Sequence, residues 1–96
     1  MNSHRADLLA GVLERLRETI PGSPVLAADT ELLDSGLLDS LGIVSVTSAL
    51  EADHGVEFPP VALRPETFTD PNALTDALVE ALATRPRRGE RHPTAP

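Results

Sequence analysis

The chain has 96 residues and a formal net charge of −7, and 41% of its residues are hydrophobic. This length suits one small domain with one core. The charge is uneven, because residues 1–84 hold four arginines against fourteen acidic residues, whereas residues 85–96 hold four arginines and one glutamate. An acidic body of this kind disfavours nucleic acid and anionic membranes as partners and favours proteins with basic patches.

The absence of cysteine excludes a disulfide framework and thiolate chemistry by the chain itself. The three histidines, His4, His54 and His92, are too widely spaced for a local metal motif, so we predict no metal site. The apolar run over residues 8–13 ends at Glu14 and lacks a basic lead-in, so it is neither a signal peptide nor a membrane span. We therefore expect a cytoplasmic monomer.

The first helix is predicted from about Arg5 to Thr19, with Ser3 as its cap. Apolar residues recur there at three- and four-residue spacing, which indicates one buried stripe. Its members are Leu8, Leu9, Val12, Leu13, Leu16 and Ile20. The prolines and glycine of residues 21–24 end this helix.

A long connection without helical periodicity then runs from Pro21 to Asp39. Loops of this length are uncommon in compact domains and are usually functional. Asp29 or Thr30 is predicted to cap a single helical turn over residues 31–33, and Gly36 to allow a tight turn before the next helix. Six apolar residues are expected to pin the loop to the bundle: Val25, Leu26, Leu32, Leu33, Leu37 and Leu38.

The second helix is predicted over Ser40–His54, and Gly55 is its C-terminal stop. Leu41 and Val44 lie on a different edge of this helix from its core stripe, so we expect them to be partly exposed. The alternative is that Val44 belongs to the core. The core stripe itself consists of Ile43, Val46, Thr47 and Leu50.

The rest of the chain completes an all-α fold. Residues 56–60 are predicted to be extended because of their two prolines, and residues 65–68 to form one short turn with Phe68 pointing inward. Asp70 and Pro71 begin a last helix. Its apolar positions are Leu74, Ala77, Leu78, Ala81 and Leu82. We predict a small four-helix bundle, with three long helices and a short third one, over residues 1–84, and a disordered basic tail over residues 85–96.

Ser40 is the candidate functional residue because it stands at the start of the amphipathic second helix. A catalytic serine needs a nearby base, but the chain has no G-x-S-x-G elbow, and His54 lies roughly 20 Å along the same helix. The alternative is that Asp39 or Ser40 only caps the helix. Ser35, in a second Asp-Ser pair, is a rival to Ser40 as the functional serine.

The stretch Asp39-Ser40-Leu41, preceded by Leu-x-x-x-Gly-Leu-Leu at residues 32–38, resembles the acyl and peptidyl carrier protein family. The resemblance covers roughly Leu8 to Leu82, including the order of helices. It implies that Ser40 carries a covalent 4′-phosphopantetheine arm, attached by a separate phosphopantetheinyl transferase, whose thiol holds cargo as a thioester. Ser35 does not fit this motif, since Gly36 follows it and no helix begins there.

The motif is most similar to discrete carriers of the D-alanyl carrier type and to those of polyketide and nonribosomal peptide pathways, including antibiotic biosynthesis. The implied partners are an adenylating ligase or acyltransferase that loads the arm, and a downstream synthase or transferase. The chain itself is predicted not to be an enzyme. The predicted partner face comprises Leu41, Val44, Ser45, Ser48, Glu51 and Asp53. The alternative is a helical interaction adaptor that docks through Leu41 and Val44, with Ser40 only as a cap.

Overall fold

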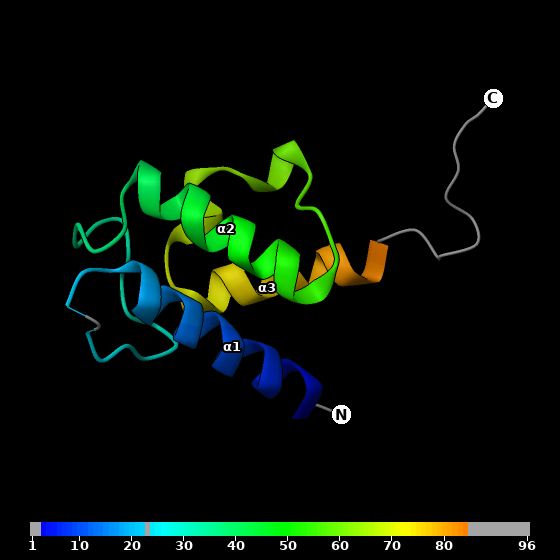
Figure 1. The fold of residues 1–96 in the computed structure, drawn as a ribbon, viewed down its shortest axis with the longest axis horizontal. Coiled ribbons are helices and arrows are strands. Elements are labelled where there is room, and N and C mark those ends of the chain that lie inside the picture. Colours follow the sequence, from blue (N-terminus) through cyan, green and yellow to red (C-terminus); the bar gives the residue numbers. More distant parts are fainter. Residues whose placement is uncertain (1–2, 23, 85–96) are drawn as a thin grey trace.

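The computed structural model describes residues 3–22 and 24–84, and all regular structure in this part of the chain is helical (Figure 1). It contains α1 (Ser3–Thr19), α2 (Ser40–His54), the 3₁₀ helices η1 (Pro60–Ala62) and η2 (Pro65–Phe68), and α3 (Pro71–Thr84). The all-α prediction is therefore confirmed. The four-helix bundle is not confirmed, because the place of the expected short third helix is taken by 3₁₀ turns. The predicted tail, residues 85–96, lies outside the described residues.

Capping residues mark two helix ends where the sequence predicted them, the start of α3 and the end of α2. Asp70 accepts a hydrogen bond at Oδ1 from the amide of Ala73, at 2.8 Å, in the first turn of α3. Gly55 ends α2 in the left-handed conformation, with φ of 64°, and its amide donates to the carbonyl of Glu51. These are the local signals that define helix ends. At the other end of the chain, α1 begins at Ser3, slightly before the predicted start.

The core forms where α1 packs against both α2 and α3 (Figure 1). Each predicted stripe contributes its central positions, while flanking members such as Leu9, Leu13 and Ile43 are only half-buried. Phe68 is 1% exposed, which confirms that η2 directs it inward. The buried apolar residues are Leu8, Val12, Leu16, Ile20, Leu32, Leu38, Val46, Leu50, Val56, Phe58, Phe68, Leu74, Leu78 and Ala81.

The long loop between α1 and α2 is fastened to the start of α3 by backbone hydrogen bonds. The amide of Leu32 donates to the carbonyl of Thr69, and the amide of Asn72 donates to the carbonyl of Ala28, both at 2.9 Å. The amide of Leu38 donates a hydrogen bond to the carbonyl of Leu32 at 3.0 Å. The side chains of Leu32 and Leu38 are also buried. The end of the loop, and with it the start of α2, is therefore held in place against the core.

Three details of the connecting segments differ from the predictions. Val25 is 95% exposed and does not pin the loop. No helical turn forms over residues 31–33, since the hydroxyl of Thr30 instead accepts a hydrogen bond from the amide of Ala27 and closes the preceding turn. Pro60 was expected in extended chain but begins η1, because proline at the first position of a helix loses no hydrogen bond.

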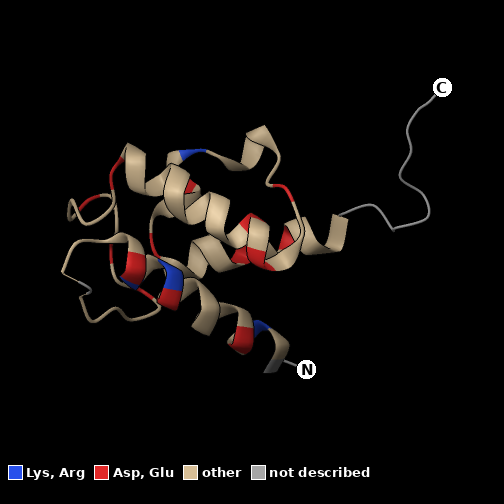
Figure 2. Cartoon of the chain, in the orientation of Figure 1, with Lys and Arg blue, Asp and Glu red and all other residues tan. Residues whose placement is uncertain are grey.

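Acidic residues occur on all three α-helices, and arginines beside some of them form ion pairs (Figure 2). Arg5 of α1 pairs with Asp76 of α3, and Arg15 of α1 pairs with Glu18 and with Asp53 of α2. The Arg5–Asp76 and Arg15–Asp53 pairs join α1 to each of the other two helices. None of the helices in the described part of the chain combines the length and apolar character needed to cross a bilayer.

Candidate functional site at the start of α2

Ser40 is the first residue of α2, and its side chain is exposed. The preceding residue, Asp39, is extended, with φ of −113°, and acts as the N-cap. Its Oδ1 accepts a hydrogen bond from the amide of Gly42 at 2.8 Å, and its carbonyl accepts one from the amide of Ile43. The cap is therefore Asp39, which leaves the Ser40 hydroxyl for another role.

The first turn of α2 lies tightly on the side chain of Leu38. A Cβ atom at position 42 would stand 2.8 Å from Cδ1 of Leu38 and 3.4 Å from Oδ1 of Asp39. Leu38 is only 3% exposed, so it has little room to move away. Gly42 thus allows the close approach that seats this turn. The sequence did not indicate this packing role of Gly42, although glycine within a helix is an unfavourable choice that signals a packing reason.

The position of Ser40 suits an anionic substituent. Helix N-termini carry a partial positive charge and unpaired amide groups, which stabilise phosphate groups. Ser40 is exposed, so a large group attached to its hydroxyl would extend into solvent and not into the protein core. The residues present therefore fit a phosphodiester-linked prosthetic group at this helix end.

Neither histidine that the structure describes lies close to Ser40. His54 is the last residue of α2, about 21 Å from Ser40 along the helix axis. The first turn of α1, which contains His4, lies at the end of the domain opposite to the start of α2 (Figure 1). Among the described residues, no cluster of three or more histidine or acidic side chains could hold a metal ion. The site has the features of an attachment point.

Ser35, the rival serine, forms part of a turn. Its hydroxyl donates to the carbonyl of Glu31 at 2.6 Å and accepts from the amide of Leu37 at 3.3 Å. Gly36, with φ of 82°, continues this turn in a conformation that other residues rarely adopt. The Ser35 hydroxyl is thus already used to shape the loop, whereas the Ser40 hydroxyl makes no hydrogen bond to another residue within 3–22 and 24–84.

The face of α2 next to Ser40 exposes large apolar side chains. Leu41 is 75% exposed and Val44 is 62% exposed, which confirms the predicted exposure and excludes the alternative that Val44 belongs to the core. Ser45 and Ser48 are exposed as well. Ala52, which was not among the predicted residues of this face, is exposed at a position that continues it by helical spacing.

Glu51 and Asp53 have partners within the domain that the sequence did not indicate. Oε2 of Glu51 accepts a hydrogen bond from the amide of Phe58 at 2.9 Å, which holds the segment after α2. Asp53 accepts two hydrogen bonds from Arg15, and these hydrogen bonds lower the pKa of its carboxyl. Neither carboxylate is simply a solvated charge beside Val44, and their contribution to partner binding stays a prediction.

The family of this chain follows from comparison with known proteins. The model of the family described as a phosphopantetheine attachment site matches residues 6–78, from α1 to the middle of α3. A search of curated proteins found no match. The chain belongs to the phosphopantetheine-binding family. It is therefore a carrier protein, and its cofactor is 4′-phosphopantetheine attached covalently to a serine.

Proposed function

We propose that Ser40 is the serine that carries 4′-phosphopantetheine, and that the protein is a discrete carrier of acyl or aminoacyl groups. One observation supports this assignment above all: Ser40 is an exposed hydroxyl at the N-terminus of α2, while Asp39 provides the cap. The prosthetic group supplies the thiol on which cargo is held as a thioester, a group that a chain without cysteine lacks.

The residues around Ser40 perform the binding and orienting roles of this function. Asp39 fixes the first turn, so that the helix end meets the phosphodiester with its partial positive charge. Leu38 and Gly42 hold the same turn against the core. Leu41 and Val44 offer an apolar surface beside the attachment point, and exposed apolar side chains near a functional group are typical of a docking surface.

The partners in this proposal are enzymes that act in sequence on one carrier. A phosphopantetheinyl transferase modifies Ser40, an adenylating ligase or acyltransferase loads the thiol, and a synthase or transferase takes the cargo. The acidic charge of residues 1–84 favours basic surfaces on these enzymes. We place the carrier in polyketide or nonribosomal peptide biosynthesis, because serines flank Leu41 and Val44 where carriers of fatty-acid synthesis have acidic residues. The carrier needs no catalytic activity of its own.

The experiment that tests the proposal is intact mass spectrometry after incubation with coenzyme A and a phosphopantetheinyl transferase. The wild-type chain and Ser35→Ala should each gain one phosphopantetheine, while Ser40→Ala should gain none. Modification of Ser40→Ala would contradict the assignment of the serine. Circular dichroism of each variant checks that the loss of modification is not a loss of fold.

A second function from a different class is a non-catalytic adaptor that docks through Leu41 and Val44. The high exposure of these two side chains favours a binding surface whether or not Ser40 is modified. The same mass measurement separates the two functions. An unchanged mass with several transferases of broad specificity would favour the adaptor.

A further inference from the structure

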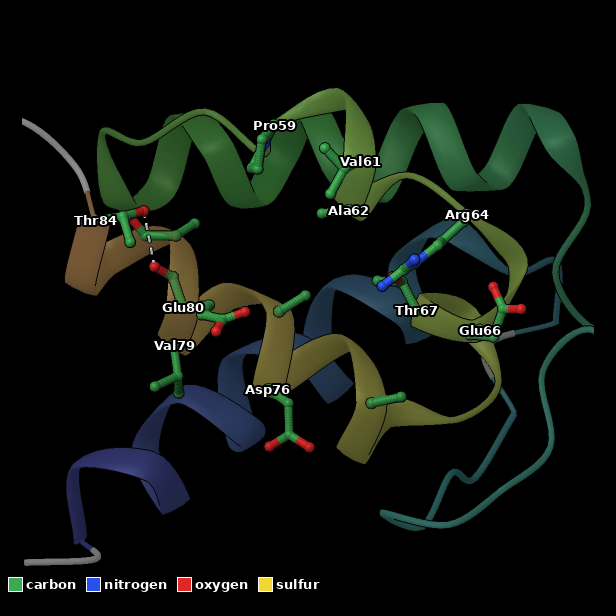
Figure 3. Close-up of a pocket in the computed structure, with 13 residues that line it drawn as sticks. Pro59, Val61, Ala62, Arg64, Glu66, Thr67, Asp76, Val79, Glu80 and Thr84 are labelled. Carbon is green, nitrogen blue, oxygen red and sulfur yellow. Dashed lines mark hydrogen bonds between the residues drawn. The ribbon is translucent and has the colours of Figure 1, made fainter.

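A groove of about 560 Å³ lies between α3 and the segment that contains η1 and η2 (Figure 3). Its apolar lining includes Val61, Ala62, Ala77 and Val79, and Val61 and Val79 remain exposed to solvent. Neither Ser40 nor the exposed apolar residues of α2 line it. The groove is thus a surface separate from the proposed attachment site, and it retains apolar area that an occupant would cover.

Charged side chains alternate along the groove. Glu80 lies near Thr84 at one end, and Arg64 and Glu66 lie at the other end (Figure 3). Asp76 lies between these ends, but Arg5 already neutralises it. Within the described residues, no ion pair forms at Glu80, Arg64 or Glu66. From the Thr84 end, the charges that remain available for an occupant are therefore negative at Glu80, positive at Arg64 and negative at Glu66.

The basic segment, defined as residues 85–96, carries the complementary order of charges. Three arginines, at positions 85, 87 and 88, come first, followed by Glu90 and then Arg91. We propose that this segment turns back at the end of α3 and binds in the groove of its own chain. In this arrangement Arg87 and Arg88 meet Glu80, Glu90 meets Arg64, and Arg91 meets Glu66.

The lengths and the local sequence are compatible with this arrangement. Ala73 and Thr84 are eleven residues apart in α3, which corresponds to about 17 Å along the helix axis. Extended chain covers about 3.3 Å per residue, so about five residues span that distance. Pro86 cannot continue α3 and disfavours helical backbone before it, which promotes a reversal. The C-terminal end of α3 also attracts cations, since its helix dipole is negative there.

Arginine is suited to a groove that is apolar below and charged along its rim. Its aliphatic stem packs on apolar surface while its guanidinium group pairs with a carboxylate. Val61 and Val79 would receive the stems, and Glu80 one of the guanidinium groups. The charged rim favours the basic segment over an uncharged acyl cargo as the occupant, and the short reach from Thr84 favours the chain's own segment, with the segment of a second copy as an outcome of the test. This inference does not depend on phosphopantetheine, and it is tested on the unmodified protein.

The test uses a spin label on the full chain at low salt. Because the chain has no cysteine, Ala95→Cys creates a single site for a nitroxide. We expect the label to broaden the amide signals of the groove residues Ala62, Thr67 and Ala77 beyond those of Glu14, an exposed residue of α1. The broadening should weaken as salt is added, because exposed ion pairs are screened.

Charge reversal supplies matched controls. Glu80→Arg should reduce the broadening in the groove, whereas Glu14→Arg, the same change outside the groove, should not. Arg64→Glu should also reduce it, and adding Glu90→Arg to Arg64→Glu should restore it. That rescue tests the direction of the segment as well as its binding.

Three results would overturn the proposal. The first is broadening confined to the last turn of α3, which tethering alone would produce. The second is groove broadening that neither charge reversal changes. The third is broadening that appears in a mixture of isotope-labelled chains without nitroxide and unlabelled chains with nitroxide, because the groove would then bind a second copy.

Discussion

The guanidinium group of Arg15 donates two hydrogen bonds to the carboxylate of Asp53, from Nε at 2.8 Å and from Nη2 at 2.6 Å. This bidentate contact joins the fourth turn of α1 to the last turn of α2. Arg15 also pairs with Glu18 on its own helix. The arginine therefore orients the end of α2 that lies farthest from Ser40.

The contact predicts a pH-dependent contribution to stability. The hydrogen bonds from Arg15 lower the pKa of Asp53, so the folded state favours the charged carboxylate more than the unfolded state does. The stabilisation is fully present above the ordinary aspartate pKa of about 4 and is lost as pH falls through the lowered value. Asp53→Asn should therefore lower the melting temperature at pH 7 and have no effect at strongly acidic pH. Asp34→Asn, at an exposed loop residue, is the control, and an equal effect of both changes would contradict the prediction.

The serine assignment predicts different effects for two alanine substitutions. Ser40→Ala should keep the stability and helical circular dichroism of the wild type and accept no phosphopantetheine. Ser35→Ala should be modified at a normal rate but lose up to about 1 kcal/mol of stability, because its hydroxyl bonds hold an exposed turn. Chemical denaturation and intact mass measure the two effects on the same samples.

The exposure of Val44 predicts that a charge there affects binding and not folding. Val44→Asp should slow loading by the cognate ligase or acyltransferase, with stability nearly unchanged, since the side chain is 62% exposed. Val46→Asp is the matched control, because Val46 is fully buried and an unpaired charge there should cost several kcal/mol. Similar losses of stability in both variants would show that Val44 packs more tightly than the structure indicates.

Two glycine-to-alanine changes should have opposite signs. Gly42→Ala places a Cβ atom against Leu38 and should cost about 1–3 kcal/mol, as overpacking does. Gly11→Ala lies in α1 with no atom within 4 Å of the added Cβ, and should stabilise by about 0.5–1 kcal/mol through helix propensity. Urea unfolding of both variants checks the difference. A stable Gly42→Ala protein would mean that Leu38 can move aside.

Truncation after Thr84 is expected to leave folding and modification intact. Residues 85–96 have no apolar periodicity that would give them a helix face to bury. The melting temperature should change little, and the transferase should modify the truncated chain as it does the full chain. A large fall in melting temperature would show that these residues belong to the folded core.

The sequence predicted α2 well because its signals are local. Asp39 caps the helix, Gly55 ends it, and the spacing of its apolar residues separates the core stripe from Leu41 and Val44. The features that it did not predict depend on residues far apart in the chain. Arg15 and Asp53 are thirty-eight positions apart, so no periodicity could pair them. Val25 and Leu32 are both apolar residues of the same loop, so composition could not predict that Val25 is exposed and Leu32 is buried.

The hydrogen bond from Leu32 to Thr69 makes the segment before Ser40 depend on residues that a ribosome adds much later. A nascent chain that ends before Thr69 cannot form this bond or the one between Asn72 and Ala28. Recognition of Ser40 by a transferase that needs the folded loop is therefore delayed until α3 has emerged. Once the bonds form, the amides of Leu32 and Asn72 should exchange with solvent deuterium only when the domain opens, although Leu32 lies in a loop and Asn72 in the first turn of α3, where amides have no partner within the helix.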